Sequence, residues 1–199
     1  ANTYTVRYND NKPSGTSNTV SGSISDSIFT YDEMSSLNKN NYFIIGYTFK
    51  GWATSKNGTV VYSDNQTVRN LTSVDGGIVE LYAVWEANEY SITFDNMGGS
   101  FANKMLIKYD EAFLEIIPPT RKGYNFEGYY TLPNGEGVKY YNNDGTAVFA
   151  KYNDDCDLTL YAKWSPIIYN IELYSRGEYI GSVKNVVYGY YFPRQLSTL

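Results

Sequence analysis

Acidic side chains are the residues of this chain best able to carry out chemistry, because hydrolysis of a glycoside needs only two suitably placed carboxylates. The candidates are two adjacent pairs, one single residue and one cluster: Asp32-Glu33, Asp110-Glu111, Asp144 and Asp154-Asp155-Cys156-Asp157. The two pairs occupy the same type of strand-to-loop junction, where a structural turn also favours acidic residues. We therefore expect no catalytic residues and no enzymatic activity.

Metal and nucleophile chemistry is also poorly supported. Residues 153–157 offer oxygen ligands, but they lack the ligand spacing, the glycine and the bidentate glutamate of a calcium loop. His is absent from the chain, which removes the commonest metal ligand and the base of Ser-His and Cys-His pairs. Cys156 has only Lys151 as a nearby cation, so we expect an inert thiol. The sequence predicts no metal and no cofactor.

The composition indicates a folded chain with an acidic balance. Its 199 residues are 42% apolar and 19% charged, which is unlike the composition of disordered chains. Lys and Arg number 16 against 21 Asp and Glu, so the net charge is −5 and a basic stripe for phosphates is not expected. No apolar run approaches the ~18 residues of a membrane span. We expect no nucleic acid partner and no direct membrane insertion.

Aromatic residues are the one feature that suggests a binding surface. The chain contains 22 Tyr, 9 Phe and 3 Trp. Rings on the outer face of a sheet can stack on sugars or anchor a protein partner. The ligand-binding candidates are Trp52, Tyr129 and Tyr130, with Tyr140 and Tyr141 as further candidates.

The face that Trp52 occupies depends on a glycine. Strict alternation puts Tyr47, Phe49 and Gly51 on one face and Trp52 on the other. A bulge at Gly51 would reset the alternation and bury the ring. A glycine also stands at the corresponding position 128, so we favour the bulge and a buried Trp52.

Internal repeats determine the organisation of the chain. Residues 46–54 recur as 123–131, and 81–85 recur as 160–164, while the opening alternation of 4–8 recurs at 90–94 and 169–173. The sequence thus contains two complete units and the beginning of a third. The predicted boundaries are 1–86 for repeat unit 1, 87–165 for repeat unit 2 and 166–199 for the first part of a truncated repeat unit 3.

The periodicity within each unit is that of β-strands. Tyr4, Val6 and Tyr8 alternate with polar residues, and the closing segments place Trp85 and Trp164 on the predicted core face. Asn-Gly pairs at 57–58 and 134–135 predict tight hairpins of type I′. Weak helical signals remain after residue 34 and in segments 64–71, 110–115 and 143–152, of which at most one short helix per unit fits. The predicted class is α+β, mostly β.

The combined order of these motifs resembles the Listeria–Bacteroides repeat, the family that includes the B repeat of internalin B. The motifs are Asn96-Met97-Gly98-Gly99, the Pro118-to-Tyr129 segment with its Gly-Tyr-x-Phe, an Asn-Gly pair and Leu-Tyr-Ala-x-Trp. The first unit lacks the Gly-Gly pair, and Tyr129 stands where the family usually has Trp. The resemblance implies tandem small β-grasp-like units on secreted or wall-anchored bacterial proteins, without catalytic residues or cofactors.

Three hypotheses about function follow, from different classes. The first is a non-catalytic repeat region of a bacterial cell-surface or secreted protein, acting as a stalk and as an adhesion or protein-interaction module. The second is a carbohydrate-binding module attached to a secreted bacterial enzyme, and the third is an enzyme that uses the carboxylates. We expect an extracellular location at the cell surface or cell wall, and a host or neighbouring-cell surface protein or glycan as partner. Because the chain opens with Ala1-Asn2-Thr3, we also expect it to belong to a longer parent polypeptide.

Overall fold

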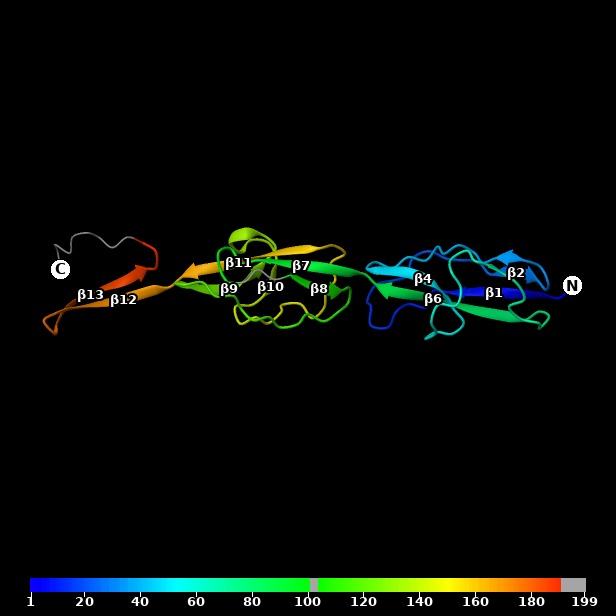
Figure 1. Ribbon diagram of the computed structural model, residues 1–199, viewed down its shortest axis with the longest axis horizontal. Coiled ribbons are helices and arrows are strands. Elements are labelled where there is room, and N and C mark those ends of the chain that lie inside the picture. The colour runs from blue at the N-terminus through cyan, green and yellow to red at the C-terminus, as the bar shows by residue number, and fades with distance from the viewer. Residues whose placement is uncertain (101–103, 191–199) are drawn as a thin grey trace. The chain divides into compact units, whose positions relative to one another are not determined.

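The computed structural model describes residues 1–100 and 104–190, and strands are its dominant regular elements (Figure 1). The chain forms two compact units. Unit 1 contains Ala1–Tyr90, Lys108–Glu111 and Lys151–Asp155, and unit 2 contains the other described residues. Two short segments from beyond residue 90 therefore pack with unit 1, and the sequence-based boundaries 1–86, 87–165 and 166–199 stay a prediction.

Unit 1 is built on a four-stranded mixed sheet in the order β2-β1-β6-β4. Its strands are β1 (Thr3–Asn9), β2 (Ser27–Thr30), β4 (Tyr47–Ala53) and β6 (Ile78–Ala87). The central strands β1 and β6 are parallel, whereas β2 and β4 lie antiparallel on either side. A small antiparallel ladder joins β3 (Ser35–Ser36) to β5 (Thr67–Val68).

Unit 2 repeats this arrangement with one more strand, in the order β10-β9-β11-β7-β8. The strands are β7 (Glu89–Asp95), β8 (Lys104–Lys108), β9 (Tyr124–Tyr130), β10 (Lys139–Tyr141) and β11 (Leu158–Pro166). Strands β7 and β11 are again the central parallel pair, and β9 runs antiparallel to β11. The short 3-10 turn η1 (Pro133–Gly135) connects β9 to β10.

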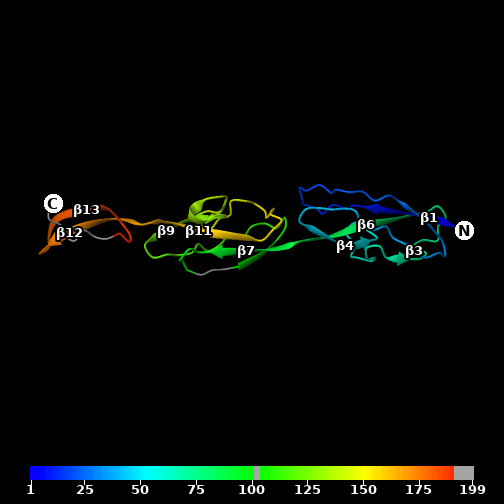
Figure 2. The ribbon, with the colours of Figure 1, turned by 90° about the horizontal axis from the view of Figure 1, so that it is seen from above.

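Beyond β11 the chain forms a hairpin of β12 (Ile168–Ser175) and β13 (Glu178–Val187), both visible in Figure 2. Arg176 and Gly177 form its tight turn with φ of 50° and 89°. The Asn-Gly prediction is confirmed at Asn134-Gly135, where φ is 62° and 80°. It is wrong for residues 57–58, since Gly58 lies outside the left-handed region and its N–H donates to the Ser55 carbonyl oxygen.

The predicted alternation places the core on one face of each sheet. Tyr4, Val6 and Tyr8 in β1 are buried, and Leu81 and Ala83 in β6 are fully buried against them. The connections between the sheet strands, including the short strand β5, supply three further buried side chains: Leu37, Ile44 and Val68. The core of each unit is therefore a sheet covered by loops.

A glycine bulge controls which ring enters the core. The pairing of β4 with β6 shifts between Phe49 and Gly51, where φ of Gly51 is 141°. A Cβ there would lie 2.6 Å from the Tyr62 carbonyl oxygen, so only glycine fits. The shift turns Trp52 inward, with 0% of its surface exposed. This confirms the predicted bulge and the burial of Trp52.

The predicted α+β class of β-grasp-like units is wrong for the described residues, which contain no α-helix, whereas the mostly β character of that prediction holds. The candidate helical segments instead pair their backbones with each other. Three bonds show this for 110–116: Asp110 N donates to Tyr152 O (2.8 Å), Phe113 N to Ala150 O (3.3 Å) and Ile116 N to Gly145 O (3.0 Å). The counterpart in the first half runs from Leu37 N to Gln66 O (2.9 Å). Within the described ranges, no helix is long and apolar enough to cross a membrane.

The predicted core positions of Trp85 and Trp164 also need correction, because both rings are only half-buried. The bulge changes the pairing beside each ring, which leaves it near the end of the sheet. Each indole N–H donates to a loop carbonyl oxygen, at 2.8 Å to Asp10 for Trp85 and 2.9 Å to Asn96 for Trp164. These rings tie the opening loop to the last strand, and Trp85 packs against the edge of the buried core.

Candidate functional site: a tyrosine joint and an aromatic hollow

Each compact unit places a tyrosine ring against a glycine that precedes a strand. In unit 1 a Cβ on Gly46 would lie 2.1 Å from the Tyr109 ring, and in unit 2 a Cβ on Gly123 would lie 2.2 Å from the Tyr188 ring. The two glycines have nearly the same φ, 79° and 78°. Any side chain here would strain the backbone and displace the ring.

A single residue between two strands completes each contact. Asn88, between β6 and β7, donates from its N–H to the Gly46 carbonyl oxygen (2.8 Å) and accepts from Tyr109 N–H (2.9 Å). Ile167, between β11 and β12, makes the same bonds with Gly123 (2.8 Å) and Tyr188 (3.0 Å). We call this arrangement of glycine, linking residue and tyrosine the tyrosine joint.

A second ring strengthens each joint. Tyr47 meets Tyr109 edge-to-face with centroids 5.9 Å apart, and Tyr124 meets Tyr188 in the same way at 5.7 Å. Such aromatic pairs contribute about 0.5–1.5 kcal/mol beyond the area that they bury. One ring of each pair, Tyr47 or Tyr124, belongs to the repeated Gly-Tyr-x-Phe motif.

The joint of unit 1 contains side-chain hydrogen bonds that have no counterpart among the described residues of the unit 2 joint. Tyr47 Oη donates to Asp110 Oδ2 (3.0 Å), and Asn18 Nδ2 donates to Tyr109 Oη (2.8 Å). Burial, together with the hydrogen bond to Asp110, raises the pKa of Tyr47 to about 12. The phenol therefore stays a neutral donor at physiological pH. Gly189 takes the place of Asp110 in unit 2 and offers no carboxylate.

The predicted ligand-binding candidates differ in how far their rings are exposed. Trp52 and Tyr129 are 0% and 3% exposed, so neither ring offers a face to a ligand. Tyr130 is half-buried, and the amino groups of Lys139 and Lys163 lie 5.7 and 5.8 Å from its ring centre. The further candidates Tyr140 and Tyr141 are buried as well. Of the three candidates only Tyr130 remains accessible.

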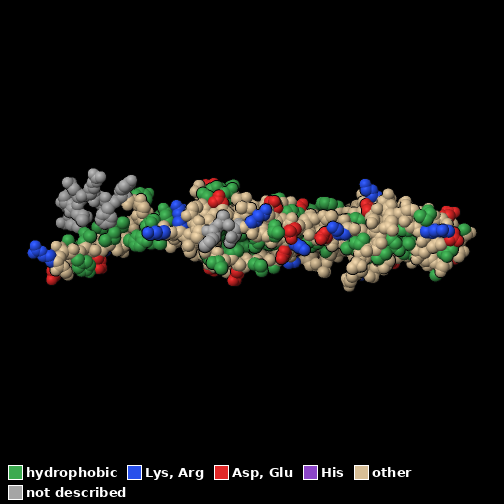
Figure 3. Space-filling view, viewed as in Figure 1, with side chains coloured by type: hydrophobic (Ala, Val, Ile, Leu, Met, Phe, Trp, Pro, Cys, Tyr) green, Lys and Arg blue, Asp and Glu red, His purple; other side chains and the backbone are tan. Residues whose placement is uncertain are grey.

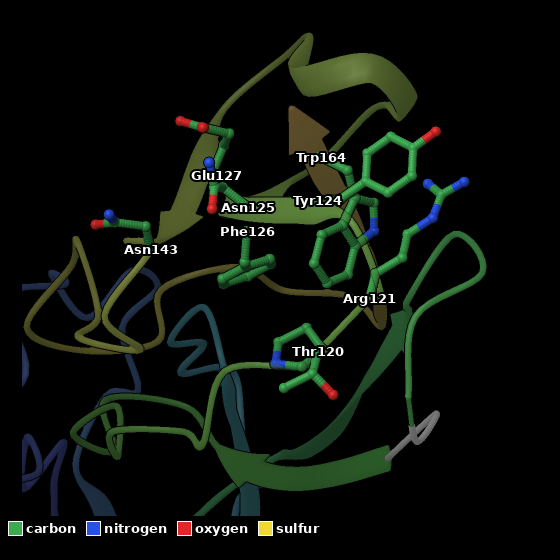
Figure 4. A pocket seen from close by; sticks show the side chains of 9 residues that line it. Thr120, Arg121, Tyr124, Asn125, Phe126, Glu127, Asn143 and Trp164 are labelled. Atoms are coloured by element: carbon green, nitrogen blue, oxygen red, sulfur yellow. The ribbon is translucent and has the colours of Figure 1, made fainter. Parts of the chain in front are cut away.

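A shallow hollow of about 450 Å³ in unit 2 brings other aromatic rings to the surface (Figure 4). Phe126 and Trp164 pack with centroids 5.5 Å apart, and the Arg121 guanidinium stands 4.1 Å above the Tyr124 ring. Polar side chains complete the lining: Thr120, Asn125, Glu127 and Asn143. The hollow thus combines aromatic faces with hydrogen-bonding groups.

The acidic candidates make structural contacts. Asp157 Oδ1 accepts from the Ser91 N–H (2.8 Å), and this backbone hydrogen bond lowers the pKa of Asp157. Asp155 accepts a short hydrogen bond from Tyr90 Oη, and Glu111 Oε2 accepts from Lys108 N–H (2.7 Å). In residues 1–100 and 104–190 no group of three or more potential ligands is placed to hold a metal. On the face shown in Figure 3, Lys and Arg lie among Asp and Glu and form no continuous basic stripe.

The repeats of the sequence align the joint tyrosines but do not indicate their role. The Tyr-Asp or Tyr-Gly pairs at 31–32, 109–110 and 188–189 mark the same point of each repeat. No periodicity or spacing indicates that such a tyrosine meets the glycine of the repeat before it. The only feature of the sequence that points to the joint is the recurrence of this Tyr-Asp or Tyr-Gly pair.

Comparison with known proteins identifies two copies of one repeat. Residues 4–84 and 90–163 each match the Listeria–Bacteroides repeat domain. The chain is 33% identical over 133 residues to a protein of Evansella cellulosilytica provisionally named as a Gly-rich membrane protein, covering 66% of this chain and 14% of that protein. It is 33% identical over 98 residues to internalin H of Listeria monocytogenes, covering 48% of this chain and 16% of that protein. The chain thus spans less than a fifth of the length of these curated relatives.

Proposed function

The chain belongs to the Listeria–Bacteroides repeat domain family, and from this premise we propose that it is a non-catalytic stalk and interaction region of a bacterial cell-surface or secreted protein. The names of its relatives support this location, since they include an internalin and a membrane protein. A stalk requires that successive repeats be connected with little slack. The connections between the strands supply that property.

The tyrosine joint is the observation that carries the stalk proposal. Strand β6 ends at Ala87 and β7 begins at Glu89, while β11 ends at Pro166 and β12 begins at Ile168. Each intervening residue makes two backbone hydrogen bonds in its joint. A connection of one residue, bonded at both its N–H and its carbonyl, cannot act as a flexible linker of the Gly/Ser type.

Distance measurements between two spin labels test this proposal. The labels are attached to cysteines introduced at the exposed positions Lys12 and Lys184, in a background in which Cys156 is replaced by Ser. We expect a narrow distance distribution, which should broaden when four Gly-Ser residues are inserted after Asn88. The same insertion after the exposed Gly76, inside a loop of unit 1, is the control and should leave the distribution narrow. A parent distribution as broad as that of the Asn88 insertion would contradict the stalk.

For the interaction role, we propose a surface protein of a host or neighbouring cell as the partner. Several large apolar side chains are exposed in each unit, including Ile28 (77%) and Ile117 (95%). A binding screen of the whole chain against an array of cell-surface proteins tests this role. Binding should survive enzymatic removal of the glycans from those proteins, and a complete absence of binding across cell types would argue against it.

The aromatic hollow favours a second candidate function, which is carbohydrate binding. Phe126 and Trp164 could stack on a sugar ring while Asn125, Glu127 and Asn143 bond its hydroxyls. A glycan array probed with the whole chain and with Trp164→Ala tests this candidate. Tyr190→Ala, at an exposed ring outside the hollow, is the matched control. Carbohydrate binding predicts a signal that Trp164→Ala removes and Tyr190→Ala keeps.

A further inference from the structure

Tyr31 occupies, in the first repeat, the position that Tyr109 and Tyr188 occupy in the later ones. Its N–H donates to the carbonyl oxygen of Asn2 (2.8 Å), just as Tyr109 N–H donates to Asn88. The next residue has positive φ in all three copies, at 66° for Asp32, 62° for Asp110 and 84° for Gly189. The backbone around Tyr31 is therefore already shaped as one half of a tyrosine joint.

Within the part of the chain that the structure describes, no Gly-Tyr-x-Phe segment contacts Tyr31. Tyr109 is 6% exposed in its joint, whereas the Tyr31 side chain stays partly exposed and has no aromatic partner among residues 1–100 and 104–190. Its surroundings are nevertheless ordered by hydrogen bonds. Asp32 accepts at Oδ1 from Arg69 (3.1 Å) and Asn70 (2.9 Å), and its N–H donates to Asn70 Oδ1 (2.6 Å).

The remaining oxygen of Asp32 matches the polar contact seen in the occupied joint of unit 1. There, Asp110 Oδ2 accepts from the Oη of Tyr47, the tyrosine of the Gly-Tyr-x-Phe motif. In the described part of the chain, Asp32 Oδ2 has no hydrogen-bond donor, and the Asn2 N–H is in the position from which Asn88 N–H reaches Gly46. An acceptor, a donor and a ring thus stand at the repeat positions that in the two joints contact the Gly-Tyr-x-Phe segment.

We propose that Asn2, Tyr31 and Asp32 form a docking surface for the Gly-Tyr-x-Phe segment of another repeat of this family, the segment represented here by 46–49 and 123–126. The ring of Tyr31 would lie on the glycine, Asn2 N–H would donate to the glycine carbonyl, and the tyrosine hydroxyl of the incoming segment would donate to Asp32. The occupant is a repeat of this family because the same contacts occur twice in this chain with such a segment. This inference rests on the proposed stalk function.

A tandem chain provides the test. Residues 1–166 are followed directly by residues 2–199, so that the second Asn2 stands where Ile167 links β11 to β12. Tyr31 of the second copy carries 3-fluorotyrosine, and its ¹⁹F shift is compared with that of the same label in the single chain. Docking predicts a change of shift toward the values of fluorinated Tyr109 and Tyr188. Tyr62, replaced in the same way, is a control that should not move.

Substitution of the glycine on which the Tyr31 ring would lie makes the test specific. Gly123→Val in the first copy places a side chain where the ring must lie, and should return the Tyr31 signal to its position in the single chain. An unchanged Tyr31 signal in the tandem chain would overturn the proposal, as would a change that Gly123→Val leaves in place. In either case, an undisturbed Tyr109 signal shows that the joint of unit 1, and with it the stalk proposal, still holds.

Discussion

The two units have the same backbone bulge, but a different aromatic residue follows the bulge glycine in each. Trp52 follows Gly51 in unit 1, and Tyr129 follows Gly128 in unit 2, with φ of 141° and 127° at the glycines. Both rings are buried. Tyr129 Oη donates to the side-chain oxygen of Asn96, whereas Trp52 Nε1 has no partner among the described residues. The bulge thus fixes the position of a large ring, whereas the hydrogen-bond partner of its polar atom depends on the local sequence.

The two tyrosine joints differ in a parallel way. Both have the glycine, the linking residue and the ring pair, but among the described residues only the unit 1 joint has a carboxylate that accepts from the motif tyrosine. The common features are made by glycines and backbone groups, and the differences by side chains. Substitutions in the two bulges and the two joints should therefore separate the contacts that both repeats share from those that occur in one repeat.

Truncation of the bulge rings should have the largest effect. Trp52→Ala and Tyr129→Ala each remove a buried ring, and we expect each to reduce the free energy of unfolding by about 3–5 kcal/mol. Trp85→Ala and Trp164→Ala should cost less, because those rings are half-buried. Urea denaturation monitored by circular dichroism provides the comparison. A greater loss for Trp164→Ala than for Tyr129→Ala would show that the ring at the sheet end is the true core residue.

Substitution of the joint glycines should have the second-largest effect on the free energy of unfolding. Gly46→Val and Gly123→Val combine positive φ with a clash against a tyrosine ring, and we expect each to cost about 2–3 kcal/mol. Gly76→Val is a useful control, because Gly76 also has positive φ but no atom of the described residues lies within 4 Å of the point that its Cβ would occupy. Equal destabilisation by all three would mean that backbone strain alone matters and that the ring contact contributes nothing.

Alkaline pH should distinguish the two joints. The folded pKa of Tyr47 is raised to about 12 from an ordinary value near 10, so the neutral phenol is the form that folding favours. Its contribution is complete below pH ~10 and is lost as the pH rises toward 12. Spectrophotometric titration of the tyrosines should show one group fewer ionising near pH 12 in Tyr47→Phe. Asp110→Asn should shift that group to lower pH, and an unchanged titration in Asp110→Asn would contradict the assigned contact.

Chelators and reductants should have the smallest effect. The acidic loop at 153–157 makes contacts to Ser91 and Tyr90, and Cys156 is exposed and forms no disulfide within the described residues. We expect the melting temperature to be the same with and without EDTA or dithiothreitol. A clear decrease in EDTA would reopen residues 153–157 as a calcium site.

Sequence reasoning reached the repeats and strands because these depend on local patterns. The alternation at Tyr4, Val6 and Tyr8 was sufficient to locate β1 and its buried face, and recurrence of glycine at 51 and 128 was sufficient to locate the bulge. The helices were wrong because the candidate segments 110–115 and 143–152 form backbone hydrogen bonds with each other, a non-local pairing that no short sequence window contains. The joint was missed for the same reason, since Gly46 and Tyr109 meet only through the fold.

Hydrogen exchange of the terminal hairpin tests most directly whether the joint couples successive repeats. A hairpin of two strands is marginal in water by itself, so protection of β12 and β13 should depend on the docking of Tyr188 against Gly123. We predict that Tyr188→Ala removes the protection of the amides in 168–187 and leaves β1 and β6 unchanged, whereas Tyr190→Ala, at a ring that is 79% exposed, has no effect. Protection of the hairpin that survives Tyr188→Ala undiminished would contradict the account.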